Sequence, residues 1–296
     1  MMNKVETEIT RLIDECDYGE VTRLFRTLSG GKRLRAKLIL KIASEHEKAP
    51  LLAAIVELIH AASLLHDDVI DEAQTRRGVA SVNATEDSKT AVMLGDILYS
   101  KAFTELVSFD ADVARAIASS VTALSKGEMI DVKMAENFNA DEEKYLDMLY
   151  LKTATLIEAS AVASAYLVGK DITNYAIYGR NLGLSFQIID DILDITQDSK
   201  TLGKPALNDF VEGKCTLPYI YLYEQLNDED KLKLKSLHLK VLNENESSWI
   251  KEKMKEFKTV EKSFKLAEKL SNEAMLAVED DVELVSILEI MIKRSY

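Results

Sequence analysis

Residues 51–71, LLAAIVELIHAASLLHDDVID, are apolar on nearly every side and end in carboxylates. Such a run is too long for a strand and lacks the polar face of a surface helix, so it predicts a buried helix. Similar spacing predicts helices over 91–107, 113–134, 147–168 and 175–195. From residue 228 onward, Lys and Glu alternate with apolar residues, which indicates amphipathic helices with solvated faces.

Turn-forming residues are scarce, with 3 prolines and 11 glycines in 296 residues. Sandwiches, barrels and doubly wound sheets need many more turns, so we expect an all-α fold. No repeat of solenoid length is visible, and no Gly/Ser-rich linker divides the chain. We therefore expect a single all-helical domain over residues 1–296, built as one large bundle.

The formal net charge of −13 disfavours a nucleic-acid partner, which normally requires a basic surface. An anionic ligand would need local cations or metal ions. Cys16 and Cys215 are the only cysteines, which suits a reducing compartment rather than a disulfide framework. No uncharged apolar run reaches ~18 residues and the first residues lack an export-signal core, so we expect a cytoplasmic protein without a membrane span.

Two aspartate clusters carry the clearest chemical signal. Each is an Asp-Asp-x-x-Asp sequence after an apolar run: Asp67, Asp68 and Asp71, then Asp190, Asp191 and Asp194. Residues four apart share a helix face, so the carboxylates repel one another unless cations lie nearby. Hard oxygen ligands favour Mg²⁺, with Mn²⁺ as a substitute. One such cluster could be a solvated acidic helix end, but two after apolar runs favour metal binding.

Basic residues follow or answer these clusters. Gly30 to Arg35, GGKRLR, combines glycines that let a ligand approach with cations suited to phosphate oxygens, although it could also be an exposed basic turn. Arg76 and Arg77 lie just beyond the first cluster, as salt-bridge partners or as a phosphate clamp. Lys204 and Lys214 follow the second cluster. This repetition favours a diphosphate held between metal ions and cations.

These segments together resemble the trans-isoprenyl diphosphate synthases, the polyprenyl synthetase family. The segments are GGKRLRA, LLHDDVIDEAQTRRG, Lys152-Thr153, GLSFQIIDDILDI, LGKPALND and EGKCTLP, and they span about two-thirds of the chain. Ala36 departs from the family, which usually has proline there; this alters a backbone constraint and leaves the charges in place.

The resemblance implies helices around a central cavity, usually in a homodimer, with both aspartate clusters holding Mg²⁺ against an allylic diphosphate. Asp67, Asp71 and Asp190 match the principal metal ligands, with Asp68, Asp191 and Asp194 in support. The catalytic set comprises Asp67, Asp71, Asp190, Lys152 and Arg76. The allylic diphosphate contacts match Arg76, Lys152, Thr153, Gln187, Lys204 and Lys214. The isopentenyl diphosphate contacts match Gly31, Lys32, Arg35, His60 and Arg77.

The expected reaction condenses isopentenyl diphosphate with an allylic diphosphate by ionisation, condensation and proton elimination. Cations placed where diphosphate charge develops lower the barrier, and an apolar cavity keeps water from the carbocation. Product length should depend on the helix above Asp67, where Ala62 and Ser63 are small and Ile59 lies two turns up. Small residues there favour a hexaprenyl to octaprenyl product for quinone tails, unless they merely permit close helix packing. Met129, Met134 or Phe103 could form a deeper floor.

Several alternatives stay open. A short-chain synthase making farnesyl or geranylgeranyl diphosphate would share every motif. A terpene cyclase would not need the second diphosphate site that Lys32, Arg35, His60 and Arg77 indicate. A non-catalytic subunit of a synthase heteromer can lose its aspartates, whereas all six are present here. A purely structural helical protein predicts no Mg²⁺-dependent diphosphate binding.

Overall fold

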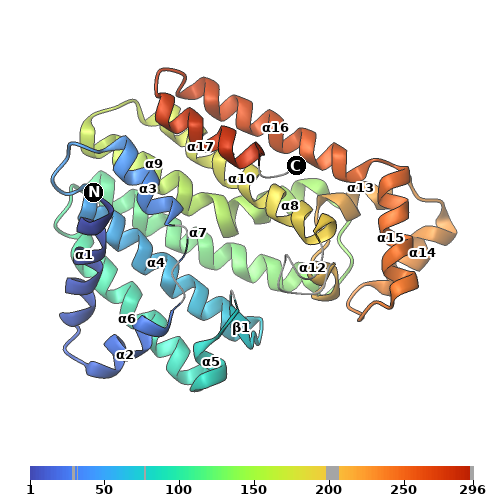
Figure 1. The fold of residues 1–296 in the computed structure, drawn as a ribbon, viewed down its shortest axis with the longest axis horizontal. Coiled ribbons are helices and arrows are strands. Elements are labelled where there is room, and N and C mark those ends of the chain that lie inside the picture. The colour runs from blue at the N-terminus through green and yellow to red at the C-terminus, as the bar shows by residue number, and fades with distance from the viewer. Residues whose placement is uncertain (29–30, 32, 77, 198–206, 294–296) are drawn as a thin grey trace. The chain divides into compact units, whose positions relative to one another are not determined.

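The computed structural model describes residues 1–28, 31, 33–76, 78–197 and 207–293, and these form an almost entirely helical structure (Figure 1). Within those ranges the strands are a short antiparallel pair, β1 (Thr75–Arg76) and β2 (Val79–Ala80). The predicted all-α fold is confirmed. The chain divides into two compact units, residues 1–122 with 156–176 (unit 1) and residues 123–155 with 177–296 (unit 2). The expectation of a single domain stays a prediction.

The helices have the following bounds. Helices wholly in unit 1 are α1 (Met2–Asp14), α2 (Gly19–Thr27), α3 (Leu34–Ile42), α4 (Ala49–Ile70), α5 (Val82–Thr85) and α6 (Ser88–Leu106). Helices that include a unit boundary are α7 (Ala111–Ala135), α9 (Thr155–Val168) and α10 (Ile172–Thr196). Helices of unit 2 are α8 (Glu142–Leu149), the π-helix η1 (Tyr150–Ala154), α12 (Asn208–Val211), α13 (Leu217–Gln225), α14 (Asp228–Leu237), α15 (Glu244–Glu256), α16 (Thr259–Ala277) and α17 (Val282–Lys293).

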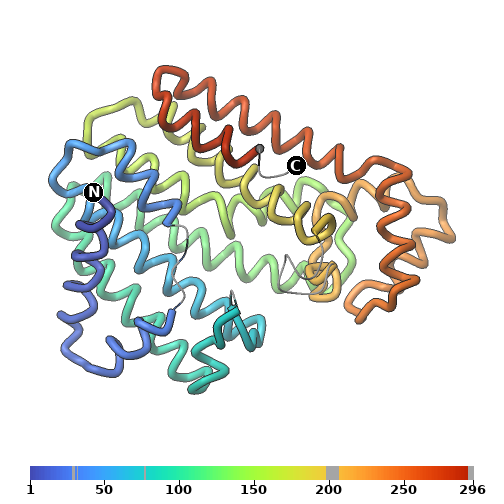
Figure 2. Tube along the Cα trace, viewed as in Figure 1, coloured from blue at the N-terminus to red at the C-terminus, as the bar shows by residue number. Residues whose placement is uncertain are grey.

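Helix α4 forms the core of unit 1. It begins with Pro50 in its first turn, where the missing N–H costs no helical hydrogen bond. Most of its residues are buried, as the apolar sequence predicted, and it lies beside α6 (Figures 1 and 2). The two helices approach closely at Gly95, where an added Cβ would lie 2.3 Å from Nε2 of His66. Glycine at this position therefore lets the acidic end of α4 pack against α6.

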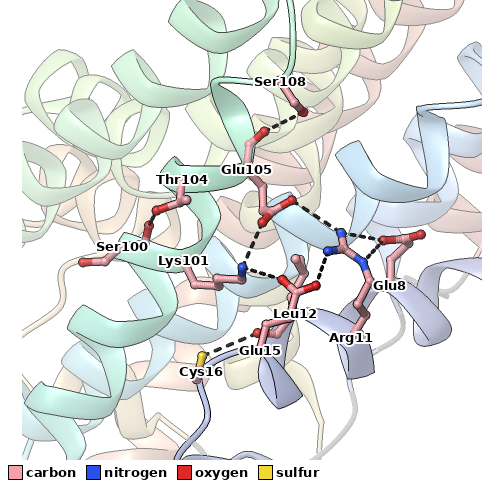
Figure 3. A network of polar contacts seen from close by, with 10 residues as sticks. All are labelled: Glu8, Arg11, Leu12, Glu15, Cys16, Ser100, Lys101, Thr104, Glu105 and Ser108. Carbon is pink, nitrogen blue, oxygen red and sulfur yellow. Dashed lines mark hydrogen bonds and ion pairs between the residues drawn. The ribbon is translucent and has the colours of Figure 1, made fainter.

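A charge network joins α1 to α6 at the surface of unit 1 (Figure 3). Arg11 pairs with Glu15 at 2.7 Å and with Glu105 at 3.4 Å. Lys101 pairs with the same two carboxylates, at 2.7 Å and 2.9 Å. Each acid thus bridges two cations, and the cations fix the N-terminal helix against α6.

In unit 2, the segment from α8 through η1 packs tightly against α7 and α10. A Cβ on Gly127 would lie 2.4 Å from the backbone N of Lys152, and one on Gly183 would lie 2.5 Å from Cα of Ala154. Glycine on the facing helices therefore accommodates the wider π-helical turn. Because π-turns are frequent at functional sites, this turn indicates that residues 150–154 belong to one.

The chain after α10 closes around a second apolar cluster in unit 2. Phe210 of α12 stacks on Tyr219 of α13 with ring centroids 4.4 Å apart, and Leu234, Ile250 and Met254 belong to the same buried cluster. This packing holds α12 against the acidic end of α10, where the backbone N of Asp209 donates to the Asp194 carboxylate.

In the described part of the chain, two helical stretches are long and apolar enough to cross a membrane on length and composition alone, Ala49–Ile70 and Glu142–Val168. Their apolar windows are 67% and 56% buried inside the protein. Core helices of soluble proteins show the same property, so these stretches are weak evidence for a membrane span.

Candidate active site

The first aspartate cluster lies at the C-terminal end of α4. Asp67 is half-buried, Asp68 is buried and Asp71, the C-cap residue, is exposed. Nε of Arg76 donates to Oδ1 of Asp68 at 2.6 Å, so Arg76 is a salt-bridge partner in this structure. Burial raises the pKa of Asp68 and the Arg76 guanidinium opposes that shift. Arg77, predicted beside it, lies outside the described residues.

The β1–β2 hairpin places Arg76 at this helix end. Asn83, which the motif analysis missed, donates from Nδ2 to the carbonyl oxygens of Asp68 at 3.2 Å and Ala73 at 3.1 Å. Ser81 donates to the Ala73 carbonyl as well, at 2.5 Å. These bonds satisfy carbonyls that a helix C-terminus otherwise leaves unpaired and fix the turn that carries Asp71.

The second cluster, near the end of α10, is covered much more extensively. Asp190 is exposed, whereas Asp191 and Asp194 are buried. Asp190 and Asp194 share a helix face by spacing, yet α12 covers Asp194 through the 3.2 Å bond from the backbone N of Asp209. Exposure therefore differs within one face because a neighbouring element covers only one turn of it.

Asp191 is held by two side chains. Tyr145 of α8 donates its hydroxyl to Oδ2, and Nε2 of Gln187 donates to Oδ1 at 2.9 Å. Burial, reinforced by Asp209, raises the pKa of Asp191 well above its ordinary value, while Tyr145 and Gln187 oppose the shift. Burial likewise raises the pKa of Tyr145, which therefore stays a hydrogen-bond donor. No sequence signal pointed to Tyr145.

Thr153 joins the same polar network, and its neighbour Lys152 pairs with two other acids. Oγ1 of Thr153 donates to Oε1 of Gln187 at 3.3 Å. Nζ of Lys152 lies 2.8 Å from Oε2 of Glu128 and 2.5 Å from Oδ2 of Asp131, and both carboxylates are buried. Burial disfavours the ammonium, but Asp131 and Glu128 outweigh it and raise the pKa of Lys152, which keeps its charge at neutral pH.

Glu128 and Asp131 were missed by the motif analysis. They are two acids three residues apart within an otherwise largely apolar part of α7, GEMID, and this pattern could have indicated a buried cation opposite them.

Helix α3 begins at Leu34, within the predicted basic segment, of which residues 31 and 33–36 are described. Arg33 adopts a left-handed backbone with φ of 52° and donates to buried Glu57 at 3.0 Å. The other carboxylate oxygen of Glu57 accepts from the backbone N of Ala36 at 3.1 Å. Proline has no N–H, so the Ala36 departure adds a bond that the usual family residue cannot make. Gly31 is exposed.

The remaining residues of the predicted diphosphate sites are partly within the described residues. Arg35 and His60 are half-buried, and Lys214 pairs with Glu212 at 3.0 Å. Lys32 and Lys204 lie outside the described residues.

The residues predicted to determine product length lie on α4. Ala62 and Ile59 are buried, and Ser63 is half-buried with its hydroxyl donating to the His60 carbonyl at 2.9 Å. Met129 is 69% exposed, so the structure does not place it in a buried floor that could stop the growing product chain. Phe103 stacks on Tyr99 and is partly exposed.

Burial separates the six aspartates into two sets. Asp68, Asp191 and Asp194 are buried and bonded to protein groups, whereas Asp67, Asp71 and Asp190 are half-buried or exposed. Among the described residues, no group of three or more His, Cys, Asp or Glu side chains could hold a metal ion. A metal ion bound to either cluster would therefore need oxygen ligands from elsewhere, such as a diphosphate or water.

The polyprenyl synthetase family model matches residues 20–257. The geranylgeranyl diphosphate synthase of Sulfolobus acidocaldarius is 33% identical over 92% of this chain and 89% of that protein. The octaprenyl diphosphate synthase of Escherichia coli is 38% identical over 65% of this chain and 62% of that protein.

Solved structures agree. The octaprenyl pyrophosphate synthase of Helicobacter pylori has a TM-score of 0.94 and 43% identity, with 98% of each chain covered. The decaprenyl diphosphate synthase of Rhodobacter capsulatus has a TM-score of 0.93 and 27% identity, covering 100% of this chain and 96% of that one. On these matches and the motifs that the family model includes, the chain belongs to the polyprenyl synthetase family.

Proposed function

We propose that this chain is a medium- or long-chain trans-polyprenyl diphosphate synthase. It condenses isopentenyl diphosphate with an allylic diphosphate, as expected of a polyprenyl synthetase. Relatives named for octaprenyl and solanesyl diphosphate support the longer product. The geranylgeranyl synthases among the relatives keep a short-chain product as the second candidate.

The observation that carries this proposal is the separation of the six aspartates by burial. The three accessible carboxylates, Asp67, Asp71 and Asp190, are those that match the family's principal metal ligands. Few hard oxygen donors per cluster suit Mg²⁺, which takes one or two carboxylates and completes its shell with water and phosphate. Bound there, Mg²⁺ would neutralise charge on the departing diphosphate. The buried Asp68, Asp191 and Asp194 keep the helix ends in place.

The cationic residues divide between two diphosphates. Thr153 and Gln187, which are hydrogen-bonded to each other, and Lys152, which is held by Asp131, bind the allylic diphosphate together with Arg76, Lys204 and Lys214. Lys152 is preorganised for this role because Glu128 and Asp131 hold its ammonium and keep it charged. Isopentenyl diphosphate is assigned to Gly31, Lys32, Arg35, His60 and Arg77.

The reaction then depends on stabilising the charge of the departing diphosphate and on excluding water from the allylic cation. The allylic C–O bond breaks, its electron pair leaves with the diphosphate, and the cations stabilise that charge. Apolar helix surfaces such as α4 exclude water from the allylic cation. The double bond of isopentenyl diphosphate supplies the electrons of the new C–C bond, and loss of a proton, with the released diphosphate as acceptor, restores a double bond.

Product length is assigned to α4. Ala62 and Ser63 lie within two turns above Asp67 and offer little bulk to stop a growing chain. We assign a hexaprenyl to octaprenyl product, suited to a quinone side chain.

A cytoplasmic homodimer completes the proposal. Val92, Met93, Phe103 and Val107 are exposed apolar side chains on or just after α6, and a second copy would cover them. The two cysteines are free, which suits a reducing compartment. Sedimentation of Phe103→Asp tests the dimer: we expect a monomer, and an unchanged dimer would exclude this face.

The decisive experiment incubates the purified chain with Mg²⁺, radiolabelled isopentenyl diphosphate and primers of different length, followed by chromatography. We expect products in the hexaprenyl to octaprenyl range, and chelation of Mg²⁺ abolishes them. A product that stops at farnesyl or geranylgeranyl supports the short-chain alternative. Release of a cyclic hydrocarbon from an allylic diphosphate alone indicates a cyclase instead.

The length assignment has its own test. Ala62→Phe with Ser63→Tyr shortens the product, whereas Ala61→Phe, about 160° around α4 from Ser63, does not. An unchanged product length in the double variant would remove α4 as the length-determining surface.

A further inference from the structure

The hairpin formed by α14 and α15 in unit 2 exposes apolar side chains beside lysines. Leu232 is 71% exposed, and Leu239 and Val241, in the connecting turn 238–243, are 50% and 89% exposed. Residues 231–240, KLKLKSLHLK, contain four lysines and no acid in a chain whose net charge is −13. We call the turn 238–243 the hairpin tip.

The hairpin is well packed, so these exposed residues are not the product of a loose segment. Leu234, Leu237, Ile250 and Met254 are buried between α14, α15 and the rest of unit 2. Nζ of Lys233 lies 4.0 Å from the ring centre of Trp249, the single tryptophan. Figures 1 and 2 show the chain passing from α14 through the tip into α15.

The tip is held in a fixed conformation. Leu239 has a left-handed backbone with φ of 60°, which is costly for a residue with a side chain. The preceding residue, His238, is buried and its Nε2 hydrogen-bonds the Gly213 carbonyl at 2.8 Å. The fold thus anchors His238 while Lys240 and Val241, two and three residues later, remain in solvent.

We propose that the hairpin tip and the exposed face of α14 dock on an anionic lipid surface. Apolar side chains flanked by lysines suit the boundary between headgroups and acyl chains. The apolar side chains insert among the acyl chains, and the lysines meet the negative charge of the headgroups. A protein partner is less well matched, because three exposed apolar side chains fall far short of the ~800 Å² per partner of a stable interface.

Nearby acids limit this attraction without cancelling it. Asp228 and Glu229 lie at the first turn of α14, at the opposite end of the helix from the tip. Asp230 pairs with Lys253 at 3.5 Å. Glu244 and Glu246 lie in the first turn of α15 next to the tip, and the Glu246 carboxylate accepts a hydrogen bond from the backbone N of Asn243 at 2.9 Å. Screening over roughly 8 Å at physiological salt makes the local lysines count more than the distant net charge.

The test uses the full chain with vesicles of pure phosphatidylcholine or of an equimolar mixture with phosphatidylglycerol. Co-sedimentation measures binding, and emission of Trp249 reports contact at the hairpin. We expect binding to the anionic vesicles only, weakening as salt increases. Val241→Asp should reduce it about tenfold, because it removes an apolar contact and adds a repelled charge.

Matched variants on α16 of the same unit serve as controls. Leu276→Asp, at an equally apolar residue that is 68% exposed, should bind as the unsubstituted chain does, as should Lys265→Glu. Lys240→Glu, at the tip, should bind less. No binding to either vesicle, or equal losses for Val241→Asp and Leu276→Asp, would overturn the proposal. A change in oligomeric state of Val241→Asp without vesicles would assign the tip to protein contact instead. These readouts need no turnover, so they stand apart from the proposed enzymatic function.

Discussion

The two aspartate clusters have the same spacing, yet the protein treats them differently. At the end of α4, Asp67 and Asp71 reach solvent and Asp68 alone is buried, with Arg76 as its partner. At the end of α10, Asp190 alone reaches solvent, and Asp191 and Asp194 are bonded into the core of unit 2. A repeated motif therefore offers two accessible carboxylates in one unit and one in the other.

The difference comes from what covers each helix end. The β1–β2 hairpin and Asn83 lie against the first cluster. Arg76 of the hairpin bonds one of its carboxylates, that of Asp68, and Asn83 bonds backbone carbonyls. Helices α8 and α12 enclose the second and bond to its carboxylates. The first cluster is thus more open to a ligand, and the second is more strongly coupled to the stability of its unit.

The largest effects should come from the accessible carboxylates. Asp67→Asn and Asp190→Asn should each lower kcat for condensation about a thousandfold, because each removes a charge that the metal ions need. Thermal stability should change little. Incorporation of radiolabelled isopentenyl diphosphate measures the rate, and Asp280→Asn, exposed and in unit 2, should retain full activity. Substantial activity in the Asp190 variant would show that the second cluster contributes no accessible ligand.

Substitutions that affect the buried carboxylates should instead change the stability of the protein. Tyr145→Phe removes a donor to buried Asp191 and should lower the free energy of unfolding by about 1–3 kcal/mol. Arg76→Met, which affects the first cluster, should cost less because Arg76 is partly exposed. Urea denaturation measures both. Tyr221→Phe, whose hydroxyl donates to half-buried Glu142, is the matched control; an equal loss there would mean that the deeper burial of the Asp191 carboxylate is unimportant.

The acids that hold Lys152 should affect the affinity for one substrate only. Glu128→Gln or Asp131→Asn should raise KM for the allylic diphosphate roughly threefold to tenfold and leave KM for isopentenyl diphosphate unchanged, because the ammonium loses one of its restraints. Steady-state kinetics with each substrate varied in turn measures the split. Asp112→Asn, exposed near the start of α7, should alter neither constant. Parallel changes in both would indicate a general structural effect.

The two thiols probe the two units separately. Burial raises the pKa of Cys215 in unit 2 to about 12, from an ordinary 9.0. The unfolded thiol ionises first, so the Cys215 contribution to stability falls as pH rises between those values. Urea midpoints at increasing alkaline pH should fall more for the unsubstituted chain than for Cys215→Ala. Half-buried Cys16 in unit 1 should react with a thiol reagent before Cys215 does.

The smallest effect is expected at the charge network between α1 and α6 (Figure 3). Glu105→Gln should lower the free energy of unfolding by about 0.5–1 kcal/mol, and salt should reduce that difference. Denaturation at low and high ionic strength measures it. A loss as large as that of Tyr145→Phe would place the surface network on a par with the buried carboxylates.

Much of the fold could be predicted because it depends on local pattern. The apolar run at 51–71 became α4 within two residues of the expected bounds, and the scarcity of proline and glycine excluded a sheet protein. The helices expected at 91–107, 113–134 and 175–195 correspond to α6, α7 and α10. The split of 142–168 into α8, η1 and α9 was not predicted, because a π-turn depends on close packing at Gly127 and Gly183.

By itself, the sequence determined the all-helical class, the two Asp-Asp-x-x-Asp clusters and the family motifs, because these follow from residue identity and spacing. Only the tertiary structure decided which carboxylates are accessible and that Glu128 and Asp131 hold Lys152. Those outcomes depend on which distant segment packs over each helix end. Burial and pKa are set by such neighbours, and spacing along a single helix carries no information about them.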